Sequence, residues 1–211
     1  PAPDRRLTAP APYAKGEKPV IFVANSRGQI LDALSLTKEL KLKAIISGGL
    51  EAWKVAKELK AANVPVLIGG TLRLPGDEHD PADAAYANPA RLSESGVKFA
   101  IRSGGSGPDQ ATSGRNLPFE AATAAAFGLS EDDAVKAVTL WPAQILGVDG
   151  QLGSLEVGKR ANLVITAGHV LQPTSEVKAL FIGGKPVTTE SKHTRLYDKY
   201  RQRLAEVKAG K

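Results

Sequence analysis

The fold is decided by one kind of strand, and its clearest example is VKFAIRSGGSGPD (97–109). The first half of this stretch is a largely apolar run, and the second half is a glycine-rich loop. Such a run is typical of a strand that is covered on both faces of a parallel sheet. Because parallel α/β proteins place their chemistry where strands end, the loop at 103–107 is the first place to look for a site.

Three earlier stretches repeat this pattern: PVIFVAN (19–25), KAIISGG (43–49) and VPVLIGG (64–70). Helical patterns lie between them, GQILDALSLTKEL (28–40) and LEAWKVAKELKAA (50–62). Strand and helix therefore alternate about every 20–30 residues, which is the spacing of βαβ units. The sequence predicts an α/β body with four parallel strands.

The pattern changes after the fourth strand. An alanine-rich helix is predicted over 116–128, and a second helix begins with Ser130 as its N-cap and is interrupted by Pro142. Two later stretches, ANLVITAG (161–168) and EVKALFIGGKPV (176–187), predict strands. The second is expected to fold back on itself at Gly183-Gly184 as a hairpin.

These patterns divide the chain into four segments. We expect an extended lead-in at 1–18, the α/β body at 19–147, a small β unit at 148–188 and a basic amphipathic helix at 189–211. Four parallel strands alone suggest half of a larger structure. An eight-stranded barrel split in the middle would leave a sheet of this kind with two unpaired edges, which favour association.

Composition excludes several classes of site. The chain has no cysteine, so disulfides, thiolate metal sites and cysteine nucleophiles are excluded. It also has no methionine, so we expect a processed chain or a piece of a longer product, and we favour an exported or periplasmic address. No apolar run approaches the about 20 residues of a membrane span.

The formal net charge is +6, and most of the excess lies in one terminal segment. From 190 to 211 there are seven Lys/Arg against three Asp/Glu, on a predicted helix with Leu196, Tyr200 and Leu204 along one stripe. This is typical of a solvated helix face. We therefore predict neither a nucleic-acid nor a membrane partner, because basic and aromatic residues do not interleave as a stacking platform requires.

Three stretches together resemble a known family. ILGVDGQLGSLEVGKRANLVI (145–165) resembles the C-terminal signature of the amidohydrolase superfamily. GLSEDDAVKAVTLWPAQILGV (128–148) is similar to the helix pair that precedes that signature, and VKALFIGGKPV (177–187) to the closing strand pair. The resemblance is to the imidazolonepropionase-like branch.

The resemblance implies a fold. The family has a metal-dependent (β/α)8 TIM-type barrel beside a small β-sandwich, and the four strands here would be barrel strands five to eight. The chain would then be the C-terminal half, and its partner the N-terminal half as a separate chain, or a second copy. A His-x-His motif and a carboxylated lysine would lie in that missing half.

The resemblance also implies where the metal ligands should be. Active relatives end strands five and six in histidine and strand eight in aspartate, whereas these strands end here at Asn25-Ser26, Ser47-Gly48 and Ser103-Gly104. Glycine has no side-chain donor, and neutral Asn or Ser oxygens are weak ligands for a divalent transition metal. No cofactor is therefore expected in this chain, and zinc only if the missing half supplies ligands.

What remains is a predicted pocket at the carboxyl ends of the strands, with catalytic residues unassigned. Arg73 and Arg102 would bring positive charge, so an anion is the expected ligand. The pocket residues are Asn25, Ser26, Ser47, Arg73, Arg102, Ser103 and Gly104.

The sequence offers other candidate sites. His79 stands beside Asp77, Glu78 and Asp80, a cluster that suits a polar surface loop more than a metal site. His169 and His193 are expected at the surface. The SGGSG loop (103–107) could hold a phosphate or carboxylate on its backbone N–H groups, although it is not a Walker loop.

One further similarity is excluded as a functional site. SGGLEAW (47–53) is similar to a rhodanese-like turn, whose chemistry needs the cysteine that this chain lacks.

Two functions follow from the resemblance and the site. One is hydrolysis of C–N bonds in amides or cyclic amides, with catalytic groups from the absent half. The other is a non-catalytic barrel half that binds a small molecule or acts as a scaffold. A half-barrel that pairs with its own copy is the third, weaker possibility.

Overall fold

The computed structural model describes residues 9–103 and 113–210. They form two compact units. The first comprises the described residues up to Lys159 together with Leu171–Pro173, and the second comprises Arg160–Val170 and the described residues from Thr174 onward. The sequence had placed the change earlier, between 147 and 148.

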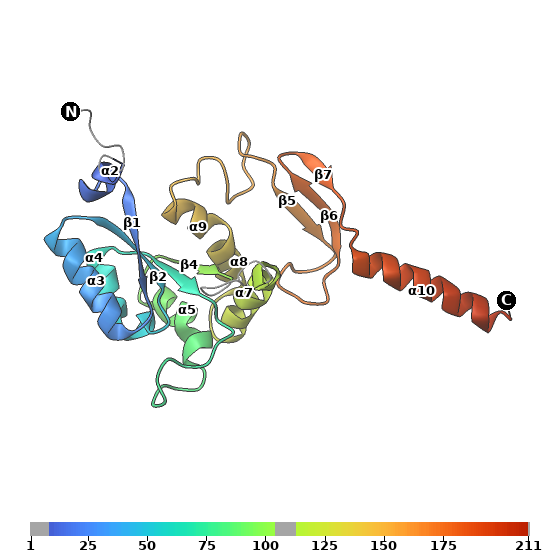
Figure 1. Ribbon diagram of the computed structural model, residues 1–211, viewed down its shortest axis with the longest axis horizontal. Helices are drawn as coiled ribbons and strands as arrows, with labels where there is room; N and C mark the ends of the chain where they lie inside the picture. Colours follow the sequence, from blue (N-terminus) through green and yellow to red (C-terminus); the bar gives the residue numbers. More distant parts are fainter. Residues whose placement is uncertain (1–8, 104–112, 211) are drawn as a thin grey trace. The chain divides into compact units, whose positions relative to one another are not determined.

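The first unit contains a four-stranded parallel sheet in the order β1-β2-β3-β4 (Figure 1). Its strands are β1 (Pro19–Ala24), β2 (Lys43–Gly48), β3 (Val66–Gly69) and β4 (Phe99–Arg102). All four coincide with the strands expected from the apolar runs. The α/β class with a parallel sheet is therefore confirmed.

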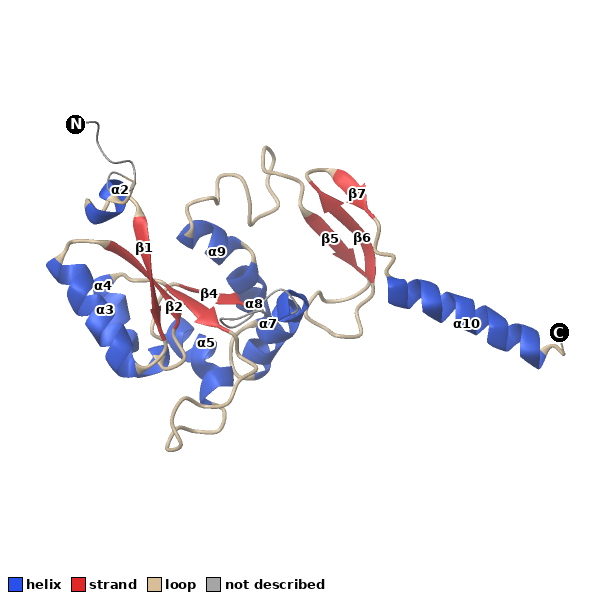
Figure 2. Cartoon of the chain, viewed as in Figure 1, coloured by secondary structure: helices blue, strands red, loops and turns tan. Residues whose placement is uncertain are grey.

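The helices precede, connect and follow these strands. Their bounds are α2 (Ala11–Ala14), α3 (Arg27–Glu39), η1 (Ala52–Val55), α4 (Ala56–Ala62), α5 (Ala84–Glu94), η2 (Gly114–Asn116), α7 (Leu117–Ala126), α8 (Glu131–Val138) and α9 (Leu140–Ile145). Ser130 caps α8 by accepting a hydrogen bond from the backbone N–H of Asp133, as its position predicts. Figure 2 shows α3 and α4 side by side next to the sheet.

The core lies between the sheet and these helices. Ile46 and Ile68 from the sheet and Ile30 from α3 have at most 1% of their surface exposed. Side chains alternate between the two faces of a strand, and residues paired across parallel strands share a face. The register therefore places Val23, Ser47 and Leu67 on the face opposite Ile46 and Ile68.

Strand β1 lies at one edge of the sheet and β4 at the other. On β1, Ile21 and Val23 leave 52% and 77% of their surface exposed, while Ala24 is buried. Exposed apolar side chains on an edge strand favour pairing with further strands. Among the described residues, the face of β1 that carries Ile21 and Val23 is therefore left largely uncovered.

Helix α5 is not among the helices named from the sequence, and Pro89 stands in its middle. Proline in a helix interior removes one backbone hydrogen bond, at a cost of about 3 kcal/mol. Here the helix is buried along most of its length, with Ala84, Ala85 and Leu92 at 2% exposure or less. Packing against the sheet outweighs the local preference.

The expectation of an extended lead-in at 1–18 is wrong for residues 11–14, which form α2. Pro12 lies in the first turn of this helix, where its fixed φ fits and its missing N–H has no partner to lose. Its carbonyl then accepts hydrogen bonds from the N–H groups of Glu17 and Lys18, at 2.9 and 3.1 Å. The same prolines that suggested an extended segment therefore open a short helical one.

The second unit holds a three-stranded antiparallel sheet of β5 (Leu163–Thr166), β6 (Val177–Ile182) and β7 (Lys185–Val187). Gly183 and Gly184 join β6 to β7 with φ values of 58° and 78°. Two positive φ values are required by the type I′ turn of a tight hairpin, so the predicted hairpin is confirmed.

Helix α10 (Lys192–Lys208) follows this sheet and begins at a capping box made by Ser191 and Thr194. It has no buried residue. Among the helices of residues 9–103 and 113–210, none combines the length and apolar character of a membrane span.

Candidate functional site

The candidate site lies at the carboxyl edge of the parallel sheet. The register brings Ala24 beside Gly48 and Gly69 beside Arg102, so the four strands end along one line. Parallel α/β folds place ligands at this edge, where loops from successive strands meet. The predicted pocket residues lie in the last positions of these strands or in the residues that follow them.

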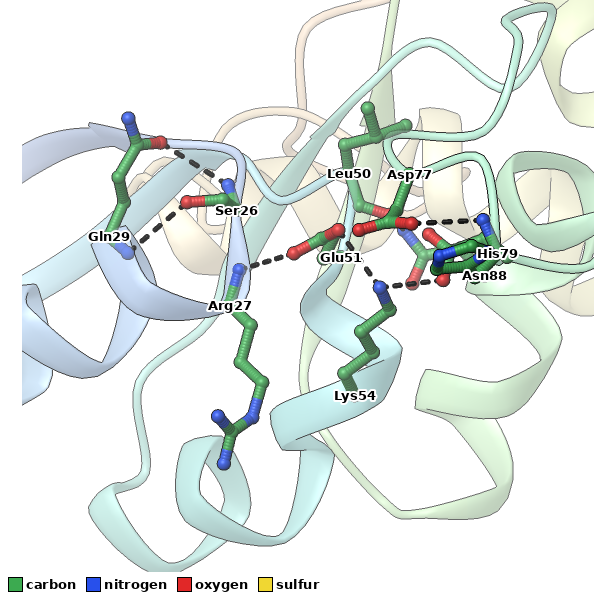
Figure 3. Close-up of polar contacts among 10 residues, drawn as sticks. Ser26, Arg27, Gln29, Leu50, Glu51, Lys54, Asp77, His79 and Asn88 are labelled. Atoms are coloured by element: carbon green, nitrogen blue, oxygen red, sulfur yellow. Dashed lines mark hydrogen bonds and ion pairs between the residues drawn. The ribbon is translucent and has the colours of Figure 1, made fainter.

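Asn25 and Ser26 follow β1 and have different surroundings. The Ser26 hydroxyl accepts a hydrogen bond from the backbone N–H of Gln29, and the Gln29 side chain accepts from Ser26 in return (Figure 3). Ser26 is thus engaged in capping α3. Asn25 Oδ1 is buried and has no hydrogen-bond partner among the described residues. A Cβ on Gly48 would lie 2.5 Å from that oxygen, so the Asn25 amide lies across Gly48.

Two arginines converge on Gly69, at the end of β3. Arg102 points to the face shared by Gly69, and its Nη2 is 3.1 Å from the position that a Cβ on Gly69 would occupy. Arg73 Nη1 donates to the carbonyl of Gly69 at 3.4 Å. The two arginines that the sequence placed at the pocket mouth are therefore brought together.

The other predicted residues are Ser47, Ser103 and Gly104. Ser47 is half-buried on the face shared with Val23 and Leu67. Ser103 is half-buried directly after β4. Gly104 and the rest of the SGGSG loop lie outside the described residues.

Glu120 belongs to this edge, although the sequence reading did not select it. Its Oε2 accepts hydrogen bonds from the backbone N–H and the hydroxyl of Thr71 and, at 2.9 Å, from the N–H of Leu72. Only 7% of Glu120 is exposed, and none of Thr71 is. Glu120 could have been selected from the sequence, because it is the only charged residue in helix α7, whose other residues are mostly apolar.

A second polar network fixes the loop that carries Arg73. Lys54 Nζ pairs with Glu51 Oε1 at 2.9 Å and with Asp80 Oδ1 at 2.6 Å (Figure 3). Glu51 Oε2 also accepts from the backbone N–H of Arg27 at 2.6 Å. The hydrogen bond to Asp80 raises the pKa of Lys54 above its ordinary value, against the opposing effect of burial.

The acidic residues around His79 differ in their exposure to solvent. Asp80 turns inward to Lys54, with 8% of its side chain exposed, whereas Glu78 and His79 are both 87% exposed. The backbone N–H of His79 donates to Asp77 and lowers the pKa of that carboxyl. Within residues 9–103 and 113–210, no three His, Asp or Glu side chains are grouped closely enough to hold a metal ion.

Comparison with known proteins identifies the family. A family model described as "Amidohydrolase family" matches residues 24–187. The chain belongs to the amidohydrolase family. This amidohydrolase-family chain is 32% identical over 167 residues to the imidazolonepropionase of Symbiobacterium thermophilum. The alignment covers 71% of the chain and 38% of that protein. The predicted family is confirmed.

A second curated relative and two solved structures agree. The chain is 37% identical over 87 residues to the 5-methylthioadenosine/S-adenosylhomocysteine deaminase of Thermodesulfovibrio yellowstonii. This alignment covers 36% of the chain and 19% of the deaminase. An amidohydrolase from Thermotoga maritima MSB8 superposes with a TM-score of 0.77 at 28% identity, covering 90% of this chain and 48% of that one.

An adenosine deaminase from Xanthomonas campestris, solved with bound zinc, shares the fold with a TM-score of 0.55 at 20% identity, covering 95% of this chain and 53% of that one. The chain thus spans about half or less of the length of the relatives named here.

Zinc does not fit the described strand ends of this amidohydrolase-family chain. Zinc in proteins is held by His, Cys, Asp or Glu, and none of these residues stands at 25, 47 or 103. Of the two buried carboxylates described near this edge, Glu120 uses Oε2 for three hydrogen-bond donors of the neighbouring loop, and Glu51 pairs with Lys54 and the backbone N–H of Arg27. The donor set therefore suits a polar organic ligand better than a divalent transition metal.

Proposed function

We propose that this chain forms the C-terminal half of an amidohydrolase-type barrel and supplies the wall of its pocket rather than its metal ligands. The observation that carries the proposal is the identity of the strand ends, where Asn25, Ser47 and Ser103 stand in place of stronger ligands. Arg73 and Arg102, which meet at Gly69, give this wall a positive charge. The pocket accordingly binds a small molecule with an anionic group.

The rest of the barrel comes from four further strands, carried by the N-terminal half of the protein or by a second copy. Two observations support this. The chain spans less than half of the solved Thermotoga maritima amidohydrolase. Strand β1 also leaves Ile21 and Val23 exposed at the sheet edge, where a neighbouring strand and a barrel interior would cover them.

The alternative function is hydrolysis of a C–N bond in an amide or cyclic amide. The 32% identity to an imidazolonepropionase favours it. In that case the metal ligands and the general base belong to the other half of the barrel, and this chain positions the substrate. Metal analysis of the assembled protein, followed by assays with amide substrates, separates hydrolysis from simple binding.

The experiment that tests barrel completion uses the natural protein with everything that co-purifies with it. Native mass spectrometry should find a further polypeptide bound to this chain, or a longer natural chain, with enough mass for four more βα units. In that assembly, Val23→Asp would place a carboxylate in the barrel interior and lower the unfolding midpoint strongly. The matched control is Val157→Asp, because Val157 is fully exposed and is expected to tolerate the charge. Equal midpoints for the two variants would contradict the proposal.

A further inference from the structure

We propose that helix α10 docks on an anionic lipid bilayer, lying flat on its surface with one side of the helix among the headgroups. The inference concerns the second unit and does not depend on the pocket of the first. The charge pattern of the sequence alone is typical of a solvated helix face. The structure adds that the apolar side of α10 is left uncovered by the described residues, since no residue of the helix is buried.

The apolar side of α10 is a continuous stripe. At about 100° per residue, its large apolar and aromatic side chains fall within roughly 100° of the helix circumference. They leave between 37% and 65% of their surface exposed. Most of the stability of an amphipathic helix comes from burying such a face, so the uncovered stripe needs a partner. The stripe consists of Leu196, Tyr197, Tyr200, Leu204 and Val207, and His193 lies on the same side.

Basic residues border the stripe along both edges. Lys199 Nζ lies 5.9 Å from the centre of the Tyr200 ring. On the other edge, the guanidinium of Arg201 lies 5.5 Å from the centre of the Tyr197 ring. These cations therefore lie next to the apolar stripe rather than behind it. The helical repeat places Lys192, Lys199 and Arg203 along one edge and Arg201 and Lys208 along the other.

The charges on the stripe side select an anionic partner. The two acidic residues of α10, Asp198 and Glu206, lie farther round the helix than the bordering bases. Lys192, Arg203 and Lys208 form no ion pair or hydrogen bond through their side chains with the described residues. A second copy of this helix would bring like charges together across the contact, which opposes self-association.

The residue types favour a lipid surface over an acidic protein. Tyrosine is enriched where membranes meet water, and two tyrosines lie on the stripe. Lysine and arginine beside an apolar layer extend their charged ends to the headgroups while their stems stay in that layer. An amphipathic helix with a basic polar side and low net hydrophobicity lies in the plane of the interface.

The test is co-sedimentation of the natural assembled protein with lipid vesicles at about 0.1 M salt. One set of vesicles contains phosphatidylglycerol and phosphatidylcholine in equal parts, and the other contains phosphatidylcholine alone. We expect the protein to bind the anionic vesicles at least about tenfold more tightly, because each basic residue near the surface adds to the attraction. Raising the salt to about 0.5 M should weaken this binding, since salt screens exposed charges.

A pair of double variants tests the basic edges. Arg203→Gln/Lys208→Gln removes one charge from each edge and should weaken binding to the anionic vesicles about 20–30-fold. The matched control is Lys38→Gln/Lys57→Gln, which removes two exposed charges from α3 and α4. Its binding should stay within about twofold of wild type, because these lysines are not on the docking helix.

A pair of neighbouring residues tests the apolar stripe. Leu204→Ser replaces an apolar side chain of the stripe and should weaken binding about tenfold. Ala205→Ser introduces the same residue one position on, away from the stripe, and should leave binding within about twofold of wild type.

Equal binding to both kinds of vesicle, or binding to neither, would overturn the inference. So would a Leu204→Ser variant that binds as tightly as wild type. If neither kind of vesicle is bound, slow hydrogen exchange along α10 in the assembly would show that a second copy or another protein covers the stripe instead.

Discussion

Replacing Glu120 with alanine should destabilise the first unit far more than its single charge suggests. The substitution leaves the backbone N–H of Thr71 buried without an acceptor, because no part of Thr71 is exposed. An orphaned buried donor costs about 1–3 kcal/mol. The Thr71 hydroxyl keeps a second acceptor, the Glu120 carbonyl at 2.8 Å, and the N–H of Leu72 can turn to water. With the lost side-chain packing, we expect about 3 kcal/mol in total.

The assay is urea unfolding of the assembled protein followed by tryptophan fluorescence. Both tryptophans of this chain, Trp53 and Trp141, lie in the first unit, so the part of the signal that comes from this chain reports on that unit. With a slope of about 2 kcal/mol per molar urea, the midpoint should fall by about 1.5 M. Glu94→Ala is the matched control, because Glu94 is exposed on α5 and should cost less than about 0.5 kcal/mol. If the two variants unfold at the same urea concentration, Glu120 does not fix the strand edge as argued.

Two further predictions concern the fixed parts of this edge. Gly49→Ala would place a Cβ 2.5 Å from Val66 Cγ1 at a φ of +60°, whereas Gly158→Ala has a φ of +94° and meets no atom within 4 Å. Gly158→Ala should therefore lower the free energy of unfolding only by the backbone strain, about 1–2 kcal/mol. Gly49→Ala should lower it by about 1–3 kcal/mol more in the same urea assay. Equal losses for the two variants would contradict the close approach to Val66. The second prediction concerns pH: because pairing with Asp80 raises the pKa of Lys54 above 10.5, its stabilising contribution is complete below pH 10.5 and disappears as the pH rises through the raised pKa. The difference in unfolding midpoint between wild type and Lys54→Met should be constant from pH 7 to 10 and shrink at higher pH, and a difference that grows there would contradict the assignment.

The strands could be predicted from the sequence because each is a short apolar run that ends in small residues. The runs at 19–25 and 43–49 became β1 and β2 within one residue at their ends. Buried parallel strands depend on local composition, so a single sequence is enough to find them. Arg73 and Arg102 both reach Gly69, but that they line a pocket stays a prediction.

Other features depend on contacts that a local pattern does not contain. Glu120 is buried because it meets Thr71, 49 residues away, and its own surroundings in sequence are only an apolar helix. Asp80 turns inward to Lys54, although its neighbours Asp77 and Glu78 predict a solvated loop. Helix α5 forms in spite of Pro89 because its apolar face packs on the sheet. In each case tertiary burial overrides the local preference.

The central claim is that the strand ends of this chain line a pocket and hold no metal. It is tested most directly by the metal content of the assembled protein after incubation with zinc and dialysis. The comparison is between wild type and the variant Asn25→Ala/Ser47→Ala/Ser103→Ala, measured by plasma mass spectrometry. The account predicts the same zinc content per protein in both. Loss of one zinc from the triple variant would contradict it.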